Sequence, residues 1–102
     1  MTARRRLPNR RPSKTTTYQK DGHVFQLVGG FYPDGTVGEA FLNAGKTNST
    51  LDALASDAAI LVSLALQFGC TIDVLRHAVK RDGTGRAASF IGEALDRLGD
   101  LS

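Results

Sequence analysis

The sequence lacks most of the residue types on which metal binding and enzyme chemistry depend. It has one cysteine, two histidines and no tryptophan in 102 residues. Cys70 alone cannot form an internal disulfide, a Cys-x-x-Cys pair or a thiolate zinc site, so we expect a buried structural thiol. No Cys, Asp or second His stands at ligand spacing from His23 or His77. We therefore predict no metal, no cofactor and no catalytic residue.

Long uncharged apolar runs are also missing. The nearest candidate, Ala58–Leu66, is shorter than the roughly 20 residues that a membrane-spanning helix needs. The opening residues carry arginines and prolines and have no apolar core of a secretory signal. These absences predict a soluble, cytoplasmic protein.

The net charge of +3 is unevenly distributed. Residues 1–14 carry six basic side chains and no acid, whereas the remainder has seven Lys and Arg against ten Asp and Glu. The basic residues are Arg4, Arg5, Arg6, Arg10, Arg11 and Lys14. Because Pro8, Pro12 and clustered arginines neither pair nor pack, we predict a disordered basic arm over 1–14 and a single domain over 15–102.

The first part of that domain has the period of two that is typical of strands. Turn dipeptides at Asp21-Gly22 and Pro33-Asp34-Gly35 separate three alternating segments, 15–20, 23–32 and 37–43. Short connections favour antiparallel neighbours. We predict a three-stranded antiparallel meander.

The period then changes to 3.6. Ser49 or Thr50 can cap a helix that runs to about Phe68, where Gly69 ends it. Shorter helices follow at Ile72–Val79 and Phe90–Leu98. The order βββααα predicts an α+β domain with the helices packed on one face of the sheet. The expected core stripe of the long helix is Leu51, Leu54, Ala55, Ala58, Leu61, Val62, Ala65 and Phe68.

Ile60 and Leu64 lie on the opposite side of the same helix, which is therefore apolar nearly all round. A small domain cannot cover both sides of such a helix with its own chain alone. We predict a homodimer with Ile60 and Leu64 near its interface.

The segment Ala40–Thr47 satisfies a relaxed phosphate-loop pattern with Ala in place of the first Gly. Phe41 and Leu42 continue the strand alternation, and no parallel βαβ unit is present, so nucleotide hydrolysis is disfavoured. A weaker interpretation is an anion or nucleotide site beside the helix start, at Asn43, Gly45, Lys46, Thr47 and Ser49. Alternatively, Gly45 makes a tight connection while Asn43 and Ser49 satisfy backbone groups.

Three segments carry a family resemblance. They are Glu39–Lys46, Ser49–Leu54 and the Ser-Leu-Ala-Leu helix end at Leu61–Gly69. Together with Ile72–Lys80 and Ser89–Asp96, they resemble the TSCPD domain, a C-terminal region of adenosylcobalamin-dependent ribonucleotide reductases that also occurs as small free-standing proteins.

The resemblance implies a relation to ribonucleotide reductase and to DNA biosynthesis. The cysteines that reductase tails use for dithiol exchange do not carry over, because exchange needs two thiols and only Cys70 is present. We therefore expect a non-catalytic accessory or regulatory module that contacts a reductase subunit or a nucleotide. The alternative is a nucleic-acid-binding protein whose arm neutralises phosphates through Arg4, Arg5, Arg6, Arg10 and Arg11.

Overall fold

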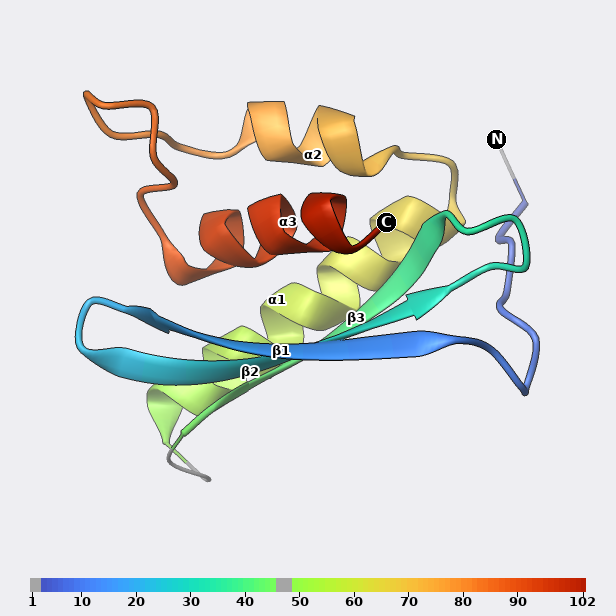
Figure 1. The fold of residues 1–102 in the computed structure, drawn as a ribbon, viewed down its shortest axis with the longest axis horizontal. Coiled ribbons are helices and arrows are strands. Elements are labelled where there is room, and N and C mark those ends of the chain that lie inside the picture. The colour runs from blue at the N-terminus through green and yellow to red at the C-terminus, as the bar shows by residue number, and fades with distance from the viewer. Residues whose placement is uncertain (1–2, 46–48) are drawn as a thin grey trace.

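The computed structural model describes residues 3–45 and 49–102. A three-stranded sheet is followed by three helices, which confirms the predicted α+β order (Figure 1). The elements are β1 (Ser13–Lys20), β2 (His23–Phe31), β3 (Val37–Ala44), α1 (Thr50–Gln67), α2 (Ile72–Ala78) and α3 (Phe90–Leu101). Ser13 and Lys14, assigned to the arm from the sequence, belong to β1.

The sheet is an antiparallel meander in the order β1-β2-β3. Its turns are those that the sequence predicted, with positive φ at Asp21 (52°), Gly22 (81°) and Gly35 (90°). Tyr18 pairs with Phe25, and Phe25 pairs with Ala44, so the three residues share one face of the sheet.

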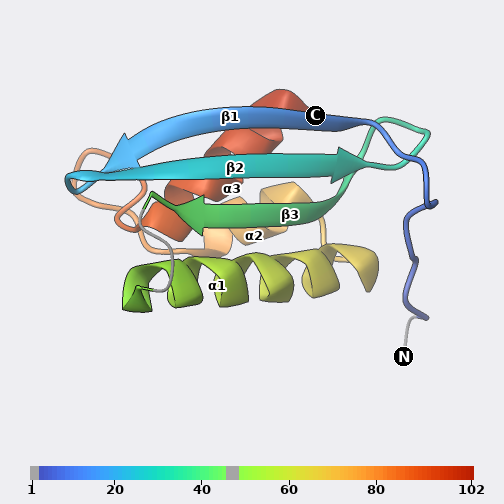
Figure 2. The same ribbon diagram turned by 90° about the horizontal axis from the view of Figure 1, so that it is seen from below.

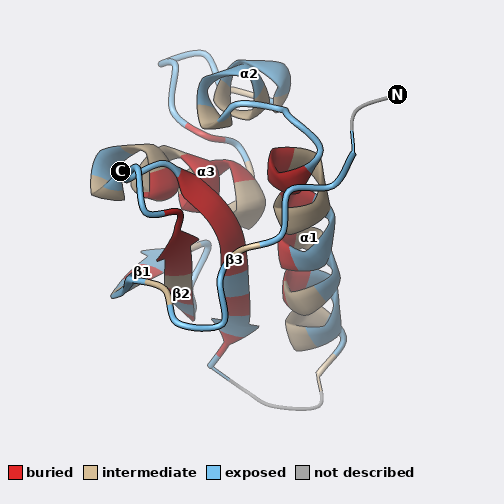
Figure 3. Cartoon of the chain, turned by 90° about the vertical axis from the view of Figure 1, so that its right-hand side faces the viewer, coloured by how far each residue is buried: buried red, intermediate tan, exposed pale blue. Residues whose placement is uncertain are grey.

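Helix α3 covers that face, and α2 packs on the outer side of α3 (Figures 1 and 3). The core between sheet and helices contains five fully buried large side chains: Phe25, Leu27, Leu42, Leu95 and Leu98. At one end Phe25 stacks on Tyr18 and on Phe90, with ring centroids 5.3 and 5.1 Å apart. Burial of these side chains is the main favourable contribution to stability.

Helix α1 runs beside β3, as Figure 2 shows. Four polar side chains on one side of the helix meet the free backbone edge of the strand. The Ala44 N–H donates to Asp52 Oδ1 (3.0 Å), and Gln67 Nε2 donates to Gly38 O (3.0 Å). Ser63 Oγ accepts from the Ala40 N–H (2.9 Å) and lies 3.1 Å from Ala40 O, and Ser56 Oγ lies 3.5 Å from Leu42 O. The helix thus supplies the hydrogen bonds that a fourth strand would make.

This use of polar residues corrects the predicted core stripe of α1. Leu54, Leu61 and Phe68 are 55%, 68% and 43% exposed, and the buried residues of the helix are Ala55, Ala59, Val62, Leu66 and Gln67. The predicted stripe was based on the apolar residues alone. Here Asp52, Ser56, Ser63 and Gln67 instead face β3, which turns the neighbouring leucines outward.

Two further expectations need correction. By length and composition alone, α1 is apolar enough to span a membrane, which a search for uninterrupted apolar runs missed. Its hydrogen bonds to β3 are those of a helix that belongs to the domain. Cys70 is exposed rather than buried, because Gly69 (φ 105°) ends α1 and turns the chain toward solvent.

Candidate functional site

The predicted nucleotide loop after β3 is mainly a connection in the part that the structure describes. The Gly45 N–H donates to Val24 O (2.8 Å), and Ser49 Oγ caps α1 by accepting from the Asp52 N–H (3.0 Å). Asn43 is exposed at the end of β3, whereas Lys46 and Thr47 lie outside the described residues. A nucleotide at this loop stays a prediction.

The arm is held to the body around Arg5. The Arg5 N–H donates to Gln67 O (2.7 Å), and Tyr32 Oη donates to Arg5 O. The Arg5 guanidinium lies 3.8 Å from the Tyr32 ring centroid and 3.5 Å from Asp34 Oδ2. Hydrogen bonds from Thr36 hold the pKa of Asp34 below its usual value, and the charge of Arg5 adds to that effect. Residue 5 therefore fixes the course of the neighbouring arginines.

Two other arm arginines contact residues at the β3–α1 junction. Arg4 Nε donates to Gln67 Oε1 (2.7 Å). Arg11 makes a two-pronged ion pair with Glu39, in which Nε donates to Oε2 and Nη2 to Oε1 (3.0 Å). The hydrogen bond to Glu39 raises the pKa of Arg11. Disorder of residues 1–14 stays a prediction, but in the structure 3–12 follow a defined course along the body (Figure 3).

Glu39 needs a glycine opposite it. Its carboxylate lies so close over Gly30 on β2 that a Cβ there would be 2.2 Å from Glu39 Oε2. The carboxylate is buried between the arm and the sheet, with its residue 9% exposed. Gly30, Glu39 and Arg11 therefore form one unit, which the sequence did not reveal because they are far apart along the chain.

Two hollows meet beside this unit and share Arg4, Glu39 and Gln67. The first, about 390 Å³, is lined mainly by apolar side chains of β3 and α1, including Phe41, Ile60 and Leu64. The second, about 240 Å³, is lined by Arg4, Arg6, Leu7, Asn9, Arg11, Glu39 and Gln67. We call the combined feature the β3–α1 groove. It has one apolar half and one cationic half.

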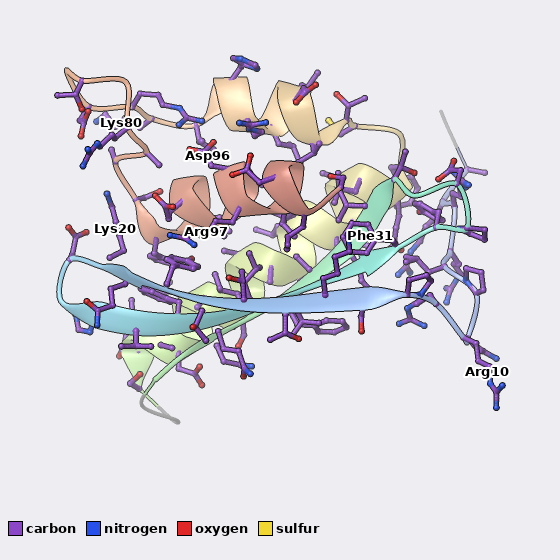
Figure 4. The ribbon with its side chains drawn as sticks, viewed as in Figure 1. Arg10, Lys20, Phe31, Lys80, Asp96 and Arg97 are labelled. Atoms are coloured by element: carbon purple, nitrogen blue, oxygen red, sulfur yellow. The ribbon has the colours of Figure 1, made fainter. Side chains whose placement is uncertain are left out.

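Of the predicted residues, the groove brings together Arg4, Arg6, Arg11, Asn43, Ile60 and Leu64. Arg5 faces Tyr32 and Asp34 instead, and Arg10 points away from the body (Figure 4). Sequence reasoning missed Phe41, which is 51% exposed. Its signal was available, because an aromatic residue alternates with Glu39 and Asn43 on one side of β3.

Two further features of the described residues bear on chemistry. Within 3–45 and 49–102, no three His, Cys, Asp or Glu side chains gather closely enough to hold a metal. Ser63 Oγ lies 2.8 Å from Ala59 O as well as contacting Ala40, so its hydroxyl has a structural role. Fold and groove together define a small α+β domain with a two-part groove beside β3 and α1.

Comparison with known proteins identifies the lineage. The chain is 36% identical over 72 residues to the vitamin B12-dependent ribonucleotide reductase of Rhodopirellula baltica, covering 71% of this chain and 7% of that protein. It is 37% identical over 70 residues to the same enzyme of Streptantibioticus cattleyicolor, covering 69% and 12%. For Bradyrhizobium diazoefficiens the match is 37% over 73 residues, covering 72% and 6%.

The chain is therefore a relative of a short segment of the vitamin B12-dependent ribonucleotide reductases, which confirms the resemblance seen in the sequence. It spans about a tenth or less of the length of these relatives. No family model matches it. No solved structure matches it either.

Proposed function

We propose that this protein is a non-catalytic accessory module that binds a ribonucleotide reductase polypeptide through the outer face of α1. A cytoplasmic location is part of this proposal. The observation that carries it is the exposure of Leu54, Leu61 and Phe68, at 55%, 68% and 43%.

These three side chains repeat every seven residues. A seven-residue apolar repeat places side chains along one seam of a helix, which is the pattern that packs against a second helix. Leu64 follows Leu61 by three residues and extends the seam, while Asp57 supplies one polar position in it. Scattered exposed leucines need no partner, but an aligned set favours an interface.

The relatives support the choice of a reductase as the partner. In each of them the matching segment is a small part of a much longer reductase chain. A segment related to part of a larger polypeptide is suited to contact the rest of such a polypeptide. The same seam, Leu64 included, would together with Ile60 also suit a second copy of this chain, so the predicted homodimer is the competing occupant.

Binding to the vitamin B12-dependent reductase of the same organism tests the proposal. We expect the full-length chain to bind the purified reductase in biolayer interferometry, and Leu61→Glu to weaken binding at least about tenfold, because a charge would be buried in the seam. Val74→Glu is the matched control, since Val74 is 57% exposed on α2, away from the seam.

Light scattering distinguishes the two candidate partners of the seam, the reductase and a second copy of this chain. A monomer that binds the reductase, with binding lost in Leu61→Glu, supports the accessory role. A dimer that Leu61→Glu converts to monomer, with no affinity for the reductase, would assign the seam to self-association and reject the proposed partner. Equal effects of Leu61→Glu and Val74→Glu would reject the seam altogether.

Two other ligands were predicted from the sequence for the same module. A nucleotide or phosphate at Asn43–Thr50 would perturb those backbone amides in a heteronuclear NMR titration with ribo- and deoxyribonucleotides. Nucleic acid on the arm is weakened as an alternative because Arg5 and Arg11 already pair with Asp34 and Glu39. Removing residues 1–11 and measuring binding to single-stranded DNA tests it.

A further inference from the structure

We propose that the β3–α1 groove is a binding site for a nucleoside phosphate, with the base in the apolar half and the phosphate in the arginine half. This inference goes beyond the proposed contact with the reductase, whose seam is Leu54, Leu61, Leu64 and Phe68 and shares only Leu64 with the groove. Of the Asn43–Thr50 loop, it uses only Asn43, which lines the apolar half. It rests on two hollows of opposite character that share Arg4, Glu39 and Gln67.

The arginine half has the charge that an anion needs. Arg4, Arg6 and Arg11 line it with one carboxylate, Glu39, so three guanidinium groups face one negative charge. Glu39 is satisfied by Arg11, which leaves the charges of Arg4 and Arg6 for a ligand. Within the described ranges, Arg6 has neither an ion pair nor a side-chain hydrogen bond. Guanidinium groups match the two-pronged geometry of phosphate oxygens.

The arm presents these arginines in a fixed position. Arg5 is bound through its backbone N–H, its carbonyl and its guanidinium. In an extended chain, residues on either side of an anchored one point the opposite way. Arg4 and Arg6 therefore face the groove together while Arg5 faces Tyr32. Pre-positioning of this kind lowers the entropy that binding would cost.

The apolar half suits a flat ring. Phe41 is 51% exposed on the uncovered side of β3, and Ile60 of α1, 56% exposed, lines the same hollow together with Leu64. An exposed aromatic side chain beside cationic groups is the arrangement on which bases stack. Asn43 lines the same half, and its amide can both donate and accept hydrogen bonds at the edge of a base.

The size of the groove fits a ligand that occupies both halves. Hollows of about 390 and 240 Å³ adjoin, within the range of roughly 300–1,000 Å³ that is usual for small-molecule sites. Inorganic phosphate would leave the apolar half empty, and a nucleoside would leave the arginines unused. A ligand with ring and phosphate joined is the one that complements both.

Titrations of the full-length chain with AMP, adenosine and inorganic phosphate, followed by amide NMR shifts, test the site. We expect AMP to shift the amides of Arg4, Glu39, Phe41 and Gln67, and to bind at least about tenfold more tightly than adenosine or phosphate alone. UMP, CMP and GMP, titrated in the same way, show which base fits. Arg6→Gln should weaken AMP binding about tenfold, which is the fold-change for one lost phosphate contact. Phe41→Leu should weaken it about fivefold through lost stacking.

Two matched controls make the result decisive. Arg10→Gln removes the same charge from the arm at a residue that points away from the body (Figure 4). Phe68→Leu changes an exposed phenylalanine that does not line the groove. Both should leave AMP affinity within twofold. The proposal is overturned if none of the four nucleotides shifts the groove amides at 5 mM (about the weakest binding worth testing), if phosphate binds as tightly as every one of them, or if Arg6→Gln and Arg10→Gln have equal effects. None of these outcomes bears on reductase binding, which Leu61→Glu reports separately.

Discussion

The two edges of the sheet are protected in opposite ways. At β3, side chains of α1 bond the backbone of the strand: Asp52, Ser63 and Gln67 reach Ala44, Ala40 and Gly38. At β1, side chains of the strand bond backbone carbonyls near α3. Lys14 Nζ donates to Leu101 O (2.9 Å), Tyr18 Oη to Phe90 O (2.7 Å) and Lys20 Nζ to Ala87 O (2.7 Å).

The β3 edge is therefore closed by a helix, whereas the β1 edge is open. Unpaired strand edges invite pairing with other chains, and natural proteins cover them or place lysines on them. This protein covers β3 with a helix and gives β1 lysines at residues 14 and 20. Because α1 already covers the β3 edge with polar side chains, its leucines face solvent. The apolar seam is thus a consequence of how the sheet is closed.

Breaking the closed edge should have the largest effect on stability. Ser63→Val puts methyl groups in place of the hydroxyl that satisfies the buried Ala40 backbone, which leaves an N–H without a partner. We expect a loss of about 2–3 kcal/mol in the free energy of unfolding, measured by urea denaturation. Hydrogen exchange at the Ala40 amide should become faster in the same variant.

Ser56→Val is its matched control. It makes the same substitution on the same helix, but Ser56 Oγ is 3.5 Å from Leu42 O, at the limit of a hydrogen bond. Its cost should be below about 1 kcal/mol. Equal losses in the two variants would mean that α1 is sensitive to valine itself, and that the β3 edge does not depend on the Ser63 hydroxyl.

On the β1 side the sheet contacts α3, and Asp96 links α3 to its neighbours. Its carboxylate pairs with Arg81 (2.6 Å) and Arg76 (3.3 Å), tying α3 to α2 and to the segment after it (Figure 4). The side chain of Asp96 is 24% exposed, so solvent weakens these pairs only in part. Asp96→Asn should cost about 1–2 kcal/mol at pH 7 in urea denaturation. Asp100→Asn, at an exposed residue of the same helix, should cost almost nothing.

The same variant gives a pH dependence with a defined sign. The hydrogen bond from Arg81 lowers the pKa of Asp96, while partial burial opposes the shift and Arg76 adds to it. Because the pKa of Asp96 is lower in the folded protein, its ionised carboxylate stabilises the fold at pH values above the unfolded-state pKa of about 3.9. This stabilisation is lost as the pH falls through the pKa of the folded protein. The difference between wild type and Asp96→Asn should be constant from pH 5 to 8, by the same linkage, and shrink below about pH 4. A difference that grows in acid would contradict the assignment.

The sequence predicted the elements better than their contacts. Turn residues at Asp21-Gly22 and the Ser49 cap are local signals, and both are confirmed. The predicted buried face of α1 was wrong, because that face is set by polar side chains that form hydrogen bonds to β3. Arg11 with Glu39 and Arg4 with Gln67 are 28 and 63 residues apart. Such pairs, which build the groove, become visible only when the chain is folded.

The smallest expected loss of stability comes from a substitution on the β1 edge. Tyr18→Phe removes the bond from β1 to Phe90 O and should cost about 1 kcal/mol near neutral pH. Burial, aided by Glu93 and opposed by Arg97, raises the pKa of Tyr18. A raised pKa means that the contribution is complete below the unfolded value of about 10 and is lost as the pH rises through the folded value. The stability advantage of wild type over Tyr18→Phe, followed by thermal unfolding from pH 7 to 11, should therefore decline above about pH 10. An advantage that stays constant to pH 11 would show that Tyr18 ionises as easily folded as unfolded, and that its bond to α3 does not hold the β1 side.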